Sequence, residues 1–213
     1  MNKNLIQDSI KFLEDDLLMK IEKGDKKGTS EVLNQLGMIY QERGDYHKAI
    51  DYYRQSLEIE NEYYGPNHPK VATTANNLGM LLRTQGKLEE AKKLYERALE
   101  IDEKAYGPNH TSVAIRVNNL GGVLQDMGKL EEAKKLYERA LEIDEKAYGP
   151  DHTSVATMAN NLGGVLRAQG KLEEAKKLYE RALEIDEKTL GKDHPHTVIM
   201  RNNLDLIKRE MEG

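Results

Sequence analysis

Apolar residues recur along this chain at helical spacing, in a pattern that returns every 42 residues. In one unit they form two groups, Val113, Val117, Leu120 and Leu124 in the first and Leu130, Ala133, Leu136, Tyr137, Ala140, Leu141 and Ile143 in the second. Steps of three and four residues place side chains on one face of an α-helix. The pattern predicts helices over about 112–127 and 130–148, and Gly128 is expected to end the first in a left-handed conformation.

The second helix of the unit, helix B, has one 18-residue sequence that occurs three times. KLEEAKKLYERALEIDEK occupies Lys87–Lys104, Lys129–Lys146 and Lys171–Lys188, and a looser copy covers Asp45–Asn61. The first helix, helix A, carries Asn-Asn-Leu-Gly from Asn76, Asn118 and Asn160, with variants from Asn34 and Asn202. A fixed period between 20 and 50 residues is typical of a solenoid. We therefore predict an all-α fold, an alpha-alpha superhelix of helix-turn-helix repeats.

Glycine-containing turns divide the chain into repeats and ends. We expect an N-terminal capping helix and link over 1–29, repeats over 30–71, 72–113, 114–155 and 156–194, and a C-terminal capping helix over 195–213. The first helix is predicted over 4–22, with Ile6, Ile10, Leu13, Leu17 and Ile21 on its buried face. Residues 23–29 form the predicted link, and Ser30 is the expected N-cap of the next helix. In the last helix, Asp205 stands in the place of the repeated Gly.

The composition argues against a nucleic-acid-binding, a membrane-spanning or a secreted protein. The 213 residues carry a net charge of −5 and include no Cys, no Trp and one Phe. A general nucleic-acid surface would be basic, and no apolar run reaches the roughly 18–20 residues of a membrane span. The N-terminus lacks the apolar core of a signal peptide. We expect a cytoplasmic protein with no nucleic-acid partner and no membrane partner.

No residue pattern indicates catalysis. Gly121-Gly122 and Gly163-Gly164 lie within predicted helices and lack the Lys-Ser/Thr of a phosphate loop. Four histidines share the 42-residue step and suggest a metal site: His68, His110, His152 and His194. Helix axes pack about 8–10 Å apart, whereas zinc ligands lie about 2 Å from the metal. We interpret these histidines as turn or N-cap residues and expect no enzyme activity, metal or cofactor.

The spacing of Leu120-Gly121, Gly128, Ala133, Tyr137 and Ala140 resembles that of the tetratricopeptide repeat (TPR). The usual period of that family is 34 residues. The 42-residue period, the Asn-Asn-Leu start and junctions such as Gly191–Pro195 are similar to the repeats of kinesin light chain and of many prokaryotic scaffold and sensor proteins. The resemblance covers about residues 30–211 and implies a right-handed superhelix with helices A lining a concave groove.

The resemblance also implies which residues face that groove. Transferred residue by residue, they are Asn34, Gln35, Met38 and Gln41 in the first repeat, Asn76, Asn77, Met80, Arg83 and Thr84 in the second, Asn118, Asn119, Gly122, Gln125 and Asp126 in the third, Asn160, Asn161, Gly164, Arg167 and Ala168 in the fourth, and Asn202, Asn203 and Arg209 in the last helix.

The chemistry of this set suits a peptide. Asn side chains offer two donors and one acceptor and can hold the backbone of an extended segment. Arg83, Arg167 and Arg209 could bind an acidic segment, and Gly122 and Gly164 would leave room for a bulky side chain. Thr73, Ile115 and Thr157 occupy the point where carboxylate-gripping relatives carry a base, which disfavours that mode. Alternatively, the first Asn of each pair bonds to a neighbouring helix, and the arginines pair with nearby acids.

Two functional hypotheses follow. The first is a non-catalytic interaction module or scaffold that binds an extended or partly helical segment of a protein partner, acidic segments included, in the groove. The second is a structural or consensus-like array, without a groove ligand, that associates through its ends or convex side. A monomer or a weak homo-oligomer is compatible with the sequence.

Overall fold

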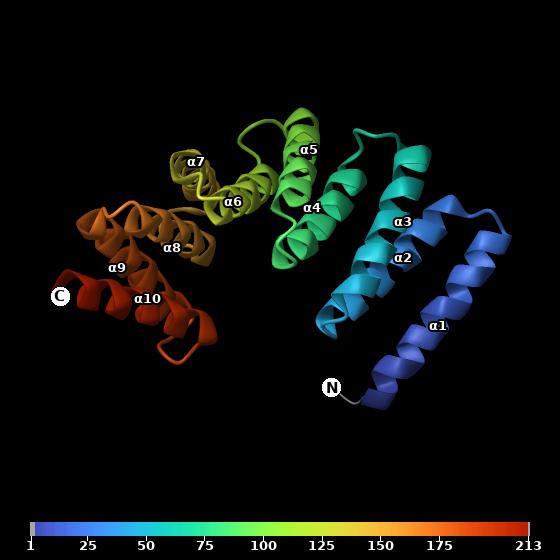
Figure 1. Ribbon diagram of the computed structural model, residues 1–213, viewed down its shortest axis with the longest axis horizontal. Coiled ribbons are helices and arrows are strands. Elements are labelled where there is room, and N and C mark those ends of the chain that lie inside the picture. Colours follow the sequence, from blue (N-terminus) through green and yellow to red (C-terminus); the bar gives the residue numbers. More distant parts are fainter. Residues whose placement is uncertain (1–2, 213) are drawn as a thin grey trace. The chain divides into compact units, whose positions relative to one another are not determined.

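The computed structural model describes residues 3–212, and these residues form ten α-helices and no strand (Figure 1). The helices are α1 Lys3–Glu22, α2 Lys26–Glu42, α3 Tyr46–Tyr64, α4 Pro69–Thr84, α5 Leu88–Tyr106, α6 Thr111–Asp126, α7 Leu130–Tyr148, α8 Thr153–Ala168, α9 Leu172–Thr189 and α10 Pro195–Glu212. The chain forms two compact units, the first ending at Ala105 and the second beginning at Tyr106. Within each unit consecutive helices pack on one another, which confirms the all-α repeat fold.

Glycines end the helices A as predicted. Gly128 has a φ of 74°, and Gly44, Gly86 and Gly170 adopt the same left-handed conformation. This conformation costs glycine little because it has no Cβ. The N–H of Gly128 donates to the carbonyl of Gln125 (2.9 Å), and the N–H of Lys129 donates to that of Leu124 (2.9 Å). Helix B can therefore begin at Leu130, as the sequence predicts.

The predicted link over 23–29 is wrong in extent. Helix α2 begins at Lys26, and Asp25 is its N-cap, with a carboxylate that accepts from the N–H of Gly28 (2.8 Å). Ser30 is buried inside α2, where its Oγ donates to the carbonyl of Lys27 (3.0 Å). The missed signal is the segment Glu22-Lys23-Gly24-Asp25, which matches Glu42-Arg43-Gly44-Asp45 and forms the same tight turn.

A glycine and a tyrosine set the distance between helices A and B of a repeat. A Cβ added to Gly121 would lie 3.1 Å from Cε1 of Tyr137, and one on Gly163 would lie 2.9 Å from that atom of Tyr179. Such contacts are too short for a side chain, so the tyrosine ring packs directly on the helix backbone. Helices A and B therefore approach each other closely at Gly121.

The four repeated histidines cap helices A, as predicted. Nδ1 of His110 accepts from the N–H of Ser112 (3.1 Å), and the same bond recurs at His68, His152 and His194. The His110 ring also stacks on Tyr106, with 4.7 Å between centroids. In the same turns, the repeated arginine of helix B donates to a proline carbonyl, from Arg97 to Pro66, from Arg139 to Pro108 and from Arg181 to Pro150.

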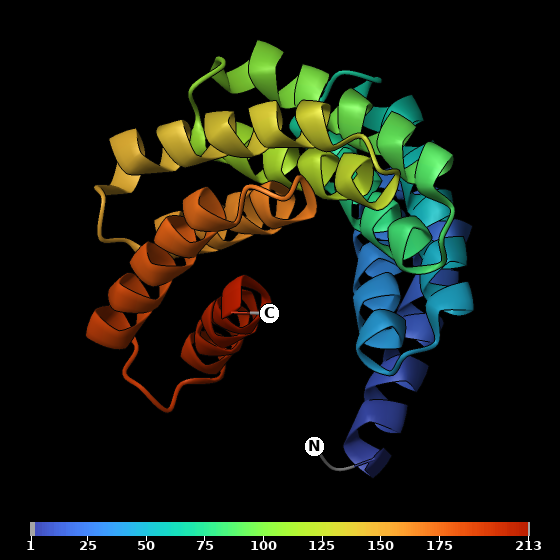
Figure 2. The same cartoon turned by 60° about the vertical axis from the view of Figure 1, so that its left-hand side comes forward.

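The terminal helices differ in how they are covered. On α1, Ile10 is buried, but Ile21 is 57% exposed. The buried face of this helix therefore ends one turn earlier than predicted. Figure 2 shows α10 as the last helix of the second unit, beside α9. It buries Met200, Leu204 and Ile207 and exposes Asp205. None of the described helices combines the length and apolar content that crossing a bilayer requires.

Candidate peptide-binding face

The candidate site lies on the helices A, which are α2 and α4 in the first unit and α6, α8 and α10 in the second. All sixteen residues that define it are carried by these helices: Asn34, Gln35, Asn76, Asn77, Met80, Arg83, Asn118, Asn119, Gly122, Gln125, Asn160, Asn161, Gly164, Arg167, Asn203 and Arg209. Their surroundings differ strongly between the two units.

The first unit has a cleft between α2 and α4, floored in part by α3. Its volume is about 340 Å³. Four of the residues predicted to face the groove line it: Asn34, Gln35, Met38 and Asn77. The other lining residues are Glu31, Glu60, Lys70, Thr73 and Thr74. The structure therefore brings together the predicted amides of two successive helices A.

A short hydrogen-bond relay forms the floor of this cleft. Asn34 Nδ2 donates to Glu60 Oε1 (2.9 Å), and Thr74 Oγ1 donates to Asn34 Oδ1 (3.2 Å). Both polar atoms of Asn34 are thus engaged. The side-chain amides of Gln35 and Asn77 make no hydrogen bond within the part of the chain that the structure describes. These two amides are available at the cleft.

Two charged groups of the cleft neutralise each other. Lys70 Nζ lies 2.8 Å from Glu31 Oε1 and donates to the hydroxyl of Tyr64 (3.1 Å). Both contacts raise the pKa of Lys70, which therefore stays cationic. Burial raises the pKa of Glu60, opposed by the nearby hydroxyl of Thr74, by the hydrogen bond from Asn34 and by the charge of Lys70.

In the second unit the asparagines bond to one another across helices. Asn203 Nδ2 donates to Asn160 Oδ1 (2.7 Å), and Asn161 Nδ2 donates to Asn118 Oδ1 (2.8 Å). Within the pairs, Asn160 donates to Asn161 (3.4 Å) and Asn118 to Asn119 (3.3 Å). We call this series the amide ladder. It ties α6, α8 and α10 together, which confirms the alternative that the first Asn bonds to the neighbouring helix.

Arg167, which was expected to bind an acidic segment, is paired with an acid of its own chain. Arg167 Nε donates to Glu210 Oε2 (2.8 Å) and Nη2 donates to Glu210 Oε1, so the guanidinium forks onto a carboxylate of its own chain. The ordinary alternative, an ion pair with a nearby acid, holds at this position. Arg209 is exposed.

The two glycines that were expected to leave room for a ligand side chain have different surroundings. Gly122 is buried, so it does not open onto a groove. A Cβ on Gly164 would lie 3.6 Å from Nε2 of Gln125, whose Oε1 accepts from the hydroxyl of Tyr137 (3.2 Å). The side chain of Gln125 thus lies beside Gly164.

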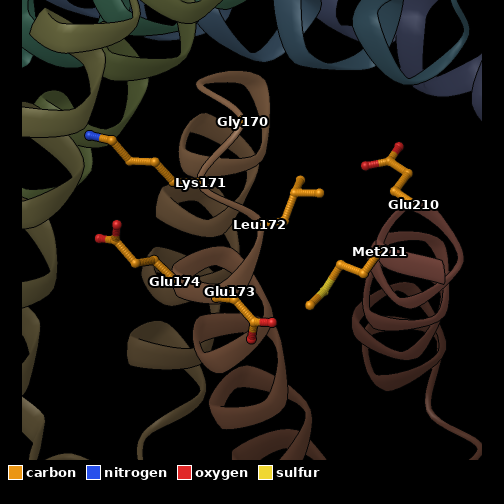
Figure 3. Close-up of a pocket in the computed structure, with 7 residues that line it drawn as sticks. All are labelled: Gly170, Lys171, Leu172, Glu173, Glu174, Glu210 and Met211. Carbon is orange, nitrogen blue, oxygen red and sulfur yellow. The ribbon is translucent and has the colours of Figure 1, made fainter. Parts of the chain in front are cut away.

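A second opening, of about 480 Å³, lies between the start of α9 and the end of α10 (Figure 3). Figure 3 shows Leu172 and Met211 pointing into it, whereas Lys171 and Glu174 point away. Its polar groups do not converge on one point, and none of its residues belongs to the predicted set. Among residues 3–212, no three His, Asp or Glu side chains are grouped as metal ligands.

A family model for the tetratricopeptide repeat matches residues 28–104, 71–117, 112–188 and 154–212. The chain belongs to the tetratricopeptide repeat family. This TPR chain is of a general protein-interaction type, and no curated protein matches it.

Solved structures show the same TPR fold. The crystal structure of BtubC (BKLC) from P. vanneervenii has a TM-score of 0.80 and 24% identity, over 96% of this chain and 83% of that chain. Two crystal structures of nearly identical TPR-like repeats from a putative kinesin light chain of Podosopora anserina have TM-scores of 0.73 and 0.72, both at 24% identity. They cover 84% of this chain and 84% and 85% of theirs. The resemblance to kinesin light chain-type repeats is confirmed at the level of fold.

Sequence reasoning missed Glu60, Thr74 and Lys70 of the first-unit cleft. All three depart from the repeat. Glu60 stands where helices B otherwise carry Asp144 and Asp186, and Lys70 where the next helices A carry Ser112, Ser154 and His196. Thr74 corresponds to Arg116, Met158 and Met200. A search for departures from the consensus would have found them.

Proposed function

We propose that this TPR protein is a non-catalytic interaction module that binds an extended polypeptide segment at the α2–α4 cleft of its first unit. The main support is a pair of side-chain amides at that cleft, those of Gln35 and Asn77, which make no hydrogen bond to any described residue. An amide that offers both donors and an acceptor can bond to the backbone of a peptide without reading its sequence.

The neighbouring groups support binding at this place. Met38 and Met80 are exposed on the same two helices, and flexible thioether side chains adapt to varied apolar partners. In the second unit the matching asparagines are engaged in the amide ladder, so they have fewer free donors. The acidic partner expected from Arg83, Arg167 and Arg209 stays a prediction. Arg167 does not support it, because its guanidinium is paired with Glu210.

The experiment compares the wild type with the double variant Gln35→Ala/Asn77→Ala against an immobilised library of short peptides. Each lost hydrogen bond contributes about 0.5–1.5 kcal/mol, so we expect affinities to fall about tenfold while the fold is unchanged. Circular dichroism checks the fold. Peptides that bind both proteins equally, or a library with no binder, would overturn the proposal.

A matched control distinguishes this site from the second unit. Asn161 occupies the position of Asn77 but donates to Asn118. Asn161→Ala should leave binding of the same peptides unchanged and lower stability instead. If Asn161→Ala weakens binding as much as the double variant does, the site is not confined to the first unit.

One observation favours a second function, association of the chain with a second copy of itself. On α1, Phe12 is 70% exposed, and Leu18 and Met19 of the same helix are also exposed. Exposed apolar groups of this kind are typical of contact surfaces. Light scattering over a concentration series tests it, with Phe12→Asp as the variant that should remain monomeric. A wild type that is monomeric throughout removes this candidate.

A further inference from the structure

One carboxyl oxygen at the first-unit cleft is buried without a hydrogen-bond donor. Glu60 is 2% exposed and lines the cleft. Its Oε1 accepts from Asn34, whereas its Oε2 has no partner in the described chain. A buried acceptor left without a donor costs free energy, and more so when it is charged. A ligand that supplies a donor here would recover that cost.

Comparison with the other repeats explains why this acid reaches the cleft. Asp144 and Asp186 occupy the same position in later helices B and are also buried. Their Oδ2 atoms bond to the residue ten positions on, the hydroxyl of Ser154 and Nδ1 of His196. After Glu60 that residue is Lys70, which is turned to Glu31 and Tyr64. The longer Glu60 side chain bonds instead to Asn34, on the cleft side.

The charges of the cleft favour a cation. Of its three ionisable side chains, Lys70 and Glu31 form an ion pair with each other. Glu60 is left without a countercharge at hydrogen-bond distance among the described residues. A positively charged donor would satisfy both the charge and the free oxygen.

The geometry separates a primary ammonium from a guanidinium. Arginine binds carboxylates best as a fork, with one N–H to each oxygen. Asn34 already occupies Oε1 of Glu60, so the fork has only one oxygen available. An ammonium group has three donors that need no common plane. It can bond to Oε2 of Glu60 and, at the same cleft, to the uncommitted oxygen of Asn77.

We propose that the α2–α4 cleft is a subsite for a lysine side chain of the bound segment, with the ammonium group on Glu60 and the aliphatic stem beside Met38. The subsite rests on the proposed function, since the lysine belongs to the segment that Gln35 and Asn77 hold. It gives the first unit a preference for a basic residue at one position of its ligand. A bound ammonium also favours the ionised form of the Glu60 carboxyl.

The first test does not depend on any peptide. n-Butylammonium is titrated into protein that is carbon-13 labelled at glutamate carboxyl groups, with the Glu60 signal assigned by its loss in Glu60→Gln. We expect a saturable shift of that signal with n-butylammonium and none with tetramethylammonium, which is a cation without donors. Equal shifts with both ions, or no shift, would falsify the subsite.

The second test uses peptide pools that differ only at one central residue, fixed as lysine, arginine or norleucine. We expect wild type to bind the lysine pool about tenfold more tightly than the norleucine pool, as a hydrogen bond to a charged group implies, and the arginine pool less tightly than the lysine pool. Glu60→Gln should abolish the preference. Asp186→Asn, which alters a buried acid that lines no such cleft, should keep the preference.

The outcomes separate the two proposals. Pools that bind with no lysine preference overturn the subsite and leave peptide binding intact. If no pool binds but n-butylammonium shifts the Glu60 signal selectively, the cation site stands and the peptide-binding function fails. Binding that prefers norleucine and weakens as the pH rises would mean that a protonated Glu60 donates to the ligand, which also overturns the subsite.

Discussion

The two units of this protein use the same asparagine positions in opposite ways. In the second unit, Asn161 and Asn203 donate across helices to Asn118 and Asn160, and the amides form a ladder. In the first unit, Asn34 is engaged by Thr74 and Glu60, and the side chain of Asn77 makes no hydrogen bond to any described residue. Equivalent residues in a repeat therefore need not have equivalent roles, because three substitutions around Asn34 redirect its bonds.

The largest expected effect comes from Asn34→Leu. This change removes the bond from Asn34 to the buried Glu60, and a hydrogen bond to a charged group contributes about 1.5–3 kcal/mol. We expect the free energy of unfolding of the first unit to fall by about 2 kcal/mol, measured by urea denaturation. The equivalent Asn160→Leu loses only neutral partners and should cost less. Equal losses in the two variants would contradict the difference between the units.

The next prediction concerns pH. Burial raises the pKa of Glu60, so the unfolded chain loses this proton at a lower pH than the folded chain does. The folded state then binds more protons, and stability falls as the pH rises from the ordinary pKa of glutamate, about 4.3, through the raised value. As the pH rises across that window, the wild type should therefore lose stability relative to Glu60→Gln, which has no carboxyl group to ionise at this position.

The control for this pH profile is Glu62, on the same helix. Lys26 lies 2.8 Å from its carboxylate and holds the pKa of Glu62 below its usual range. The contribution of this pair is present above the ordinary pKa and is lost as the pH falls, so Glu62→Gln should show a weak dependence of opposite sign. A Glu60→Gln profile parallel to wild type would show that Glu60 is not buried as described.

A smaller effect distinguishes Asn161 from Asn77. Asn161→Ala removes one neutral hydrogen bond and should lower stability by about 1 kcal/mol, whereas Asn77→Ala should stay within about 0.5 kcal/mol of wild type. Thermal or urea unfolding of both variants measures this directly. If Asn77→Ala is the more destabilising change, its amide has a structural partner and the proposed site loses its main support.

The smallest effect on stability is expected from Thr74→Val. This variant tests most directly why Asn77 is free in the first unit whereas Asn161 is bonded in the second. The substitution removes the hydroxyl that donates a hydrogen bond to Asn34 Oδ1, while the shape of the side chain is nearly unchanged. Asn77 can then donate to Asn34 as Asn161 donates to Asn118, which offsets most of the loss. Slower hydrogen exchange of the Asn77 side-chain amide would report the new bond, and peptide binding should weaken. Unchanged exchange together with unchanged binding would contradict the explanation given for the free amide.

The sequence by itself determined the local structure of this protein. Apolar spacing, Gly128 and the repeated 18-residue segment predict α7 to the residue, and the shared histidines predict the helix caps, because these features depend on neighbours within one repeat. The same local logic failed at Asp25, which is the N-cap of α2 although it lies inside the predicted link, and at Ile21, which was predicted to be buried and is exposed.

Only the tertiary structure decided which of the candidate side chains are free. Asn77, Asn119 and Asn161 look alike along the chain, and Arg167 looks like an open cation. The partners of Asn161 and Arg167 lie on other helices about 40 residues away, in the pairs Asn161–Asn118 and Arg167–Glu210. A hydrogen bond depends on positions and angles set by packing, and a helical periodicity of 3.6 residues does not contain them.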